Sequence, residues 1–139
     1  MLQARIPALV LSLLAAAMLA ACAAGTGQPP HPYALFEPDQ RWVNSETRPA
    51  FLLEVDGDQR SIDRIDPVLP GMRKLVVSVP SGRNVSMGYG GSRRETMTID
   101  AKPCVRYYLA AKRSQDGGGD WVPFVAATEA ISGCRAVAS

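Results

Sequence analysis

The sequence predicts an all-β protein, namely a single small β-sandwich of about seven short and mostly antiparallel strands. In several short segments apolar residues recur at every second position, which is the period of a half-buried strand. Gly, Pro and Asp residues that favour tight turns separate these segments at short intervals. Residues 22–139 follow an apolar N-terminal segment and are long enough for one hydrophobic core, but too short for two domains.

The first 21 residues are typical of a cleaved bacterial signal peptide. Arg5 is their only charged side chain, and from Ala8 to Ala21 every residue except Ser12 is apolar or small. Such a run matches the apolar region of a signal peptide and falls short of the ~20 residues that span a bilayer. The following Leu19-Ala20-Ala21-Cys22 resembles a lipobox at all four positions. We therefore predict cleavage before a lipid-modified Cys22; ordinary secretion with a free Cys22 thiol and an uncleaved anchor helix are the alternatives.

Lipidation of Cys22 would hold the mature chain on a membrane, because two or three acyl chains make such binding durable. The next residue is Ala23. In enterobacteria-like sorting an Asp at this position retains a lipoprotein at the inner membrane, so Ala23 favours the outer membrane. We expect residues 22–32 to form a flexible tether, since Gly and Thr precede a proline-rich stretch. His31 lies in that stretch and is expected to be a solvated linker residue, and the folded domain is expected over residues 33–139.

The expected strands begin with Phe51–Val55, which alternates and runs into the tight-turn sequence Asp56-Gly57-Asp58. A short returning strand is expected at about 60–65, and Leu75–Val79 follows as a strand with one buried face. Pro123 lacks a backbone N–H and predicts that the last strand lies at a sheet edge. The remaining expected elements are possible strands at 85–89 and around Met97–Ile99, strands over Cys104–Lys112 and Trp121–Ala126, and a short helical turn over Ala126–Ile131.

Cysteine usage predicts one disulfide bond. If Cys22 carries lipid, Cys104 and Cys134 remain as an even pair in an oxidising compartment. A metal site is not expected, because the chain has no Cys-x-x-Cys and only one His. No cofactor is expected either.

Known catalytic patterns are missing from the sequence, so we do not expect an enzyme. Counted from Asp56 as an EF-hand loop, the twelfth position is Pro67 where Glu is required. The glycines at 88–91 precede no Gly-Lys-Ser/Thr motif and no helical pattern. There is no Gly-x-Ser-x-Gly motif, and a single His in a linker cannot serve a triad. The formal net charge of +2 without a basic cluster argues against nucleic acid as a partner.

Two groups of side chains are candidate contacts for a partner. Arg83, Arg93 and Arg94 lie on or near an expected hairpin tip, where they are either simply solvated or meet anionic lipid or an acidic partner. The aromatic residues are expected in the core, with an exposed recognition patch as the alternative. They are Trp42, Tyr107, Tyr108, Trp121 and Phe124.

Part of the chain resembles PEGA-type and related transthyretin-like β-sandwich modules. The resemblance covers Phe51 to Lys112 and implies the fold alone. Cys104, Trp121–Phe124 and Cys134 are similar to a group of small uncharacterised proteobacterial lipoproteins, which implies an envelope location and no activity. The two-cysteine C-terminal extension is not part of the PEGA pattern. The matching segments are Val55-Asp56-Gly57, Leu69-Pro70-Gly71, Leu75 to Val79, Met97 to Ile99 and Tyr107-Tyr108-Leu109.

From these observations we expect a non-enzymatic, lipid-anchored protein of the outer membrane that faces the periplasm. It would act as a binding or scaffolding module for another envelope protein or for peptidoglycan. The alternative is a cell-wall-directed hydrolase, or an inhibitor of a lysozyme-type hydrolase. An inhibitor requires a protruding loop, for which Gly88–Arg94 and Gln115–Asp120 are the candidates.

Overall fold

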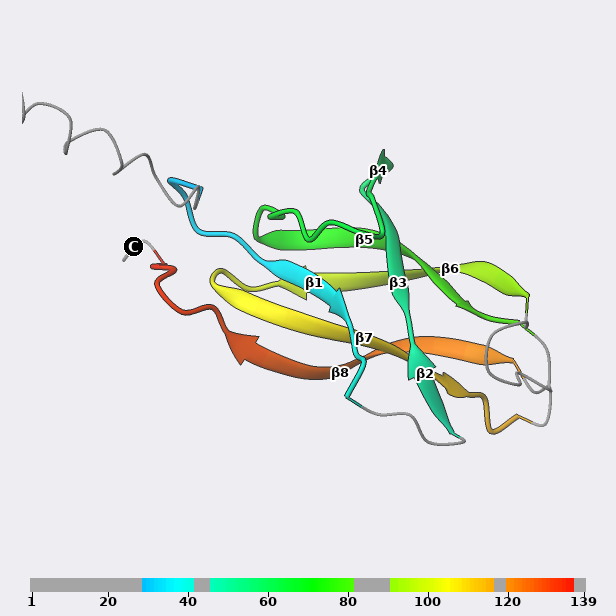
Figure 1. Cartoon of the computed structure of the whole chain (residues 1–139). Helices are drawn as coiled ribbons and strands as arrows, with labels where there is room; N and C mark the ends of the chain where they lie inside the picture. The colour runs from blue at the N-terminus through cyan, green and yellow to red at the C-terminus, as the bar shows by residue number, and fades with distance from the viewer. Residues whose placement is uncertain (1–28, 42–45, 82–90, 117–119, 137–139) are drawn as a thin grey trace, which may run out of the picture.

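A computed structural model describes residues 29–41, 46–81, 91–116 and 120–136 of the chain. The predicted signal peptide, Cys22, Trp42, Arg83 and the possible strand at 85–89 lie outside these ranges. The described residues form two packed β-sheets, which confirms the predicted all-β sandwich (Figure 1). Their eight strands are β1 Leu35–Pro38, β2 Thr47–Pro49, β3 Phe51–Val55, β4 Asp58–Gln59, β5 Gly71–Pro80, β6 Ser92–Ala101, β7 Val105–Arg113 and β8 Trp121–Ala130.

The first sheet has the strand order β4-β3-β5-β6 and is antiparallel throughout. A two-residue turn joins β3 to β4, and both of its residues, Asp56 and Gly57, have positive φ angles of 52° and 91°. These angles suit a hairpin turn that follows the twist of the strands, so the predicted Asp-Gly turn is confirmed.

The expected strand at 60–65 is wrong, because β4 ends at Gln59. Arg60 N still donates to Leu53 O at 2.7 Å, after which the chain leaves the sheet. The two apolar residues that follow, Ile62 and Ile65, are 57% and 49% exposed. They are three positions apart in the sequence, so they would lie on opposite faces of a strand and cannot line one face.

The long hairpin of β5 and β6 confirms the predicted alternation. Leu75, Val77 and Val79 of β5 are buried, with at most 1% of each exposed. Met97 and Ile99 of β6 are partly buried and pack against the same core. This hairpin therefore supplies most of one wall of the hydrophobic core.

The second sheet is built around β7. β8 pairs with one side of β7 in antiparallel register, while β1 (parallel) and β2 (antiparallel) share its other side. Within the described residues β8 pairs only with β7, which confirms the edge position predicted from Pro123. The expected helical turn at Ala126–Ile131 is wrong: β8 continues to Ala130, because the long strand β7 offers a ladder partner as far as Val105.

One chain segment crosses between the two sheets. Figure 1 shows the chain running from β2 in the second sheet directly into β3 in the first. Ala50 alone separates the two strands, and this residue is fully buried. The carbonyl of Leu109 on β7 accepts from Asp39 N at 2.8 Å and from Ala50 N at 3.2 Å. The ends of β1 and β2 therefore meet at the same point of β7. The buried core between the sheets includes Ala34, Phe36, Val55, Leu75, Val77, Val79, Tyr107, Leu109 and Trp121.

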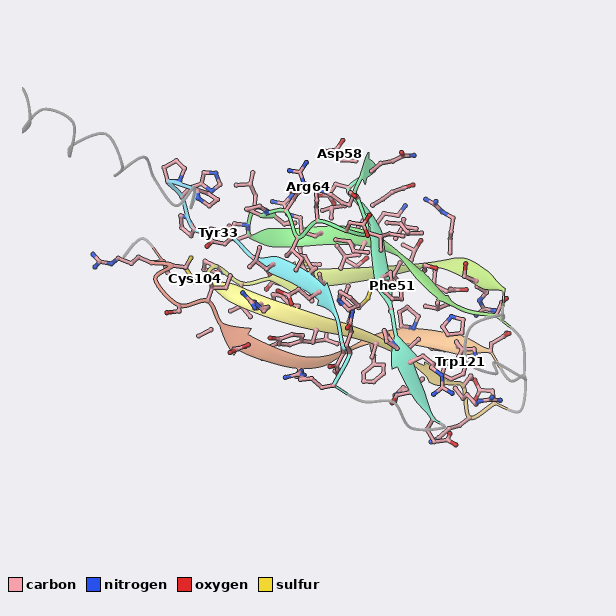
Figure 2. All side chains as sticks on the ribbon, in the orientation of Figure 1. Tyr33, Phe51, Asp58, Arg64, Cys104 and Trp121 are labelled. Carbon is pink, nitrogen blue, oxygen red and sulfur yellow. A yellow bond between two sulfur atoms is a disulfide. The ribbon has the colours of Figure 1, made fainter. Side chains whose placement is uncertain are left out.

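The two ends of the described chain meet at one end of the sandwich, which we call the tether end (Figure 2). Cys104 and Cys134 form a disulfide bond with a Cα–Cα distance of 5.4 Å, which confirms the predicted pair. Cys104 N also donates to Tyr33 O at 2.8 Å. Ile131 packs there with Tyr33 and Leu35 in a second, smaller apolar cluster. Trp121 marks the opposite end of the molecule (Figure 2).

Candidate functional site

The two described arginines among the predicted partner contacts are engaged in ion pairs within the chain. Arg93 lies 2.8 Å from Glu95 and 2.9 Å from Asp120, which ties β6 to the beginning of β8. Arg94 pairs with Glu54 on β3. The two side chains alternate along β6, with Arg93 half-buried and Arg94 exposed, so they do not form one joint surface. A role for them in binding a partner stays a prediction.

A shallow groove on the flank of the sandwich brings charged and apolar side chains together. Its volume is about 360 Å³, which lies at the lower end of the range of small-molecule sites. The end of β1 and the residues after it contribute one part of the lining, and the connection between β4 and β5 contributes another. We call it the Arg41 groove; its lining residues are Glu37, Pro38, Gln40, Arg41, Ile62, Asp63, Ile65 and Tyr108.

Asp39 positions Arg41 in this groove. The Asp39 side chain is 1% exposed, and its Oδ1 accepts from Arg41 N at 3.2 Å and from Arg41 Nε at 3.0 Å. Asp39 is fixed in turn by the hydrogen bond from its own N–H to Leu109 O. The Arg41 guanidinium is thereby held 3.9 Å from the centroid of the Tyr108 ring, in cation–π contact. The hydrogen bond to Asp39 raises the pKa of Arg41, so the guanidinium keeps its charge.

Tyr108 connects the groove to the edge strand β8. Its hydroxyl donates to Glu129 Oε2 at 2.6 Å, and this hydrogen bond, together with burial, raises the pKa of Tyr108. On the same strand, β7, Arg106 Nε lies 3.2 Å from Oε1 of Glu37 on the neighbouring strand β1. Side chains from β1, β7 and β8 therefore form one polar network on the outer face of the second sheet, and the groove opens beside it.

The expectation that Tyr108 lies in the core is wrong. Tyr107 and Leu109 point inward and are 6% and 0% exposed, so the pleat of β7 turns Tyr108 to the outer face. Phe124 is also only half-buried, and Lys112 Nζ lies 5.4 Å from its ring centroid. The core positions of Tyr107 and Trp121 are confirmed.

Sequence inspection missed Asp39 and Arg41. The available signal was the Asp-x-Arg spacing directly after Pro38, because Asp side chains commonly accept hydrogen bonds from the backbone two residues on. The burial of Asp39 had no sequence signal, since it depends on the backbone of β7 at Leu109.

The Arg41 groove has the chemistry of a binding surface. Ile62 and Ile65 offer exposed apolar contacts, and Asp63 and Arg41 offer charged groups of both signs. An aromatic and an arginine side chain held together are frequent anchors of protein interfaces. In the part of the chain that the structure describes, no three His, Cys, Asp or Glu side chains lie close enough together to hold a metal ion.

Comparisons with known proteins give no relative. No protein-family model matches the chain, and neither the curated proteins nor the solved structures contain a significant match. The resemblance to PEGA-type modules therefore stays a prediction. Across residues 29–41, 46–81, 91–116 and 120–136, no helix is long and apolar enough to cross a membrane.

Proposed function

We propose that this chain is a lipid-anchored envelope protein that binds a partner through the Arg41 groove and has no catalytic activity of its own. The observation that carries the proposal is the lipobox-like Leu19-Ala20-Ala21-Cys22 at the end of a 14-residue apolar run, Ala8–Ala21. The partner is another envelope protein or peptidoglycan. The anchored domain faces the periplasm, and Ala23 favours the outer membrane as the membrane that holds it.

The groove supports a binding role because its charged side chain is already ordered. Arg41 is held by Asp39 against Tyr108, so a partner that contacts it does not have to immobilise a long and mobile side chain. Ordering such a side chain costs about 0.5–1.5 kcal/mol in a typical interface. Ile62 and Ile65 add exposed apolar area, and the burial of this area under a partner would favour binding.

The anchor is tested with a Cys22→Ser variant in a bacterial host. The wild-type chain should fractionate with membranes, and its intact mass should show acyl groups and the absence of residues 1–21. The variant should appear in the soluble periplasmic fraction with the Cys104–Cys134 bond intact. Membrane fractionation of the variant, or a wild-type mass without acyl groups, would contradict the proposed anchor.

The groove is tested by photo-crosslinking from the lipidated chain in cells. A crosslinking residue at Gln40, an exposed position in the groove lining, is compared with one at Thr98, an exposed position on β6. Capture of one stoichiometric protein from position 40 alone favours scaffolding, and capture of muropeptides favours a wall-binding role. Equal capture from both positions would show that the groove is not the site.

The same samples separate the alternative functions. A hydrolase would release soluble muropeptides from purified cell wall. The proposed module would release none, whether or not it binds the wall. An inhibitor would be captured together with a lysozyme-type enzyme and would lower the activity of that enzyme.

A further inference from the structure

The tether end carries a turn with exposed apolar side chains. The sequence Leu69-Pro70-Gly71-Met72 joins the β4–β5 connection to β5 and has no charged side chain. Leu69 is 57% exposed and Met72 is 65% exposed. Transfer of this exposed apolar area from water into an apolar phase is favourable by about 25 cal/mol per Å². We call this segment the apolar turn.

The apolar turn lies beside the point where the chain enters the domain. Ala34 N donates to Val68 O at 2.8 Å, and Val68 N donates to Ala34 O at 2.9 Å. Leu69 directly follows Val68, and Ala34 directly follows Tyr33, the first buried residue of the described chain. The apolar turn therefore stays next to the N-terminal tether.

The backbone of the apolar turn is held in place by Arg73. Its Nε donates to Leu69 O at 2.7 Å, and its Nη2 donates to Pro70 O at 2.8 Å. Its Nη1 is fixed by Asp56 Oδ2 at 2.9 Å. Gly71 has a φ of 112°, a conformation that other residues rarely adopt. The turn is therefore stiff, and the side chains of Leu69 and Met72 stay exposed at low cost in conformational entropy.

Basic side chains lie at the same end of the sandwich. Gly71 pairs with Ala101 across the β5–β6 ladder, so the next residue, Lys102, lies close to the turn. Lys102 is exposed and pairs with Asp100. Arg135 is also exposed and directly follows Cys134, which is bonded to Cys104. An apolar tip with neighbouring lysine and arginine side chains suits the boundary between acyl chains and lipid phosphates.

We propose that the tether end rests on the bilayer, with Leu69 and Met72 inserted at the interface and Lys102 and Arg135 at the lipid phosphates. This inference rests on the proposed lipidation of Cys22. The seven residue steps from Cys22 to Pro29 span at most about 25 Å when fully extended. The tether end is therefore the part of the domain held nearest to the membrane. The anchor also keeps the turn at a high effective concentration beside the lipid, so two inserted side chains are enough for docking.

The test places a fluorescent side chain on the apolar turn. Leu69→Trp is compared with a matched control, Val122→Trp, which replaces an exposed apolar residue of β8 beside Trp121 at the opposite end. The purified, mature lipidated chain is reconstituted into phosphatidylcholine vesicles with and without brominated acyl chains. The unchanged chain supplies the background emission of Trp42 and Trp121. Met72→Trp is a second probe of the same turn, in case Leu69→Trp does not fold.

Docking predicts that emission from position 69 shifts to the blue and loses intensity on brominated vesicles, while emission from position 122 does neither. Equal behaviour of the two probes would overturn the inference. A blue shift without bromine quenching would also overturn it, because the turn would then be covered by a second copy of the chain. Intact mass on the same samples separates the two proposals. A lipidated chain with an unquenched probe refutes docking alone, whereas a chain without acyl groups refutes both.

Discussion

Loss of the Cys104–Cys134 bond should lower the stability of the domain by a calculable amount. The two cysteines are 30 residues apart. Closing a loop of that length in the unfolded chain removes entropy worth about 3.6 kcal/mol at 25 °C. The predicted domain, 33–139, has an unfolding entropy of about 0.22 kcal/mol/K at typical values per residue. A double Cys104→Ala, Cys134→Ala variant should therefore melt about 16 °C below the parent protein.

The assay is thermal and urea unfolding followed by circular dichroism. Both proteins carry Cys22→Ser, so that no third thiol exchanges with the pair. Reductant should destabilise the parent by the same amount and leave the double variant unchanged. A difference below about 1 kcal/mol would refute the reasoning, because the chain-entropy contribution would then be offset by structure that persists in the unfolded chain.

Two further predictions concern pH. The hydrogen bond from Lys74 N and the ion pair with Arg73 hold the pKa of Asp56 below its usual value of 3.8. The Asp56 carboxylate therefore stabilises the fold at pH values above 3.8. This contribution is lost as the pH falls through the pKa of Asp56 in the folded state. Asp56→Asn should therefore lose less stability than the parent protein between about pH 5 and pH 3, measured by urea unfolding; a parallel loss in both proteins would contradict this. Because the hydrogen bond to Glu129 raises the pKa of Tyr108, its stabilising contribution is present below the usual tyrosine pKa and lost as the pH rises through the folded value. Glu129→Gln should lower the pKa of Tyr108 in an absorbance titration at alkaline pH, with Tyr108→Phe assigning the signal; an unchanged titration would argue against the hydrogen bond.

The longest strands were predictable because their pattern and their packing agree. Leu75, Val77 and Val79 alternate with residues of the outer face, and the Asp56-Gly57 turn needs the positive φ angles that these residues tolerate. The short strands β1 and β2 were not predicted. Each has only three or four residues, and each includes a proline. Both exist because β7 offers a free edge, and that contact between distant parts of the chain leaves no local pattern.

The candidate site was harder to predict than the fold, because its key residues depend on long-range contacts. Tyr107 and Tyr108 are two adjacent tyrosines, and the pleat of β7 turns only one of them to the core. Tyr107 shares the inward face with Leu109, so Tyr108 faces outward. Arg93 and Arg94 were identified as exposed cations, yet Asp120 and Glu54 from distant segments pair with them. Sequence patterns indicate which strands exist, whereas the partners of surface charges follow from how the sheets are assembled.

The two proposed contact surfaces depend on one segment, the β4–β5 connection at residues 60–70. Its first half contributes Ile62 and Ile65 to the Arg41 groove, and its last residues begin the apolar turn at Leu69. Val68 lies between the two surfaces, is 3% exposed, and pairs with Ala34 where the chain enters the domain. The segment is thus fixed to the sandwich at the point nearest to the proposed anchor. If the apolar turn rests on the bilayer, the same attachment sets the height of the groove above the lipid. A partner would then bind the Arg41 groove close to the membrane surface. This position favours a partner protein held in the same membrane over a soluble partner protein.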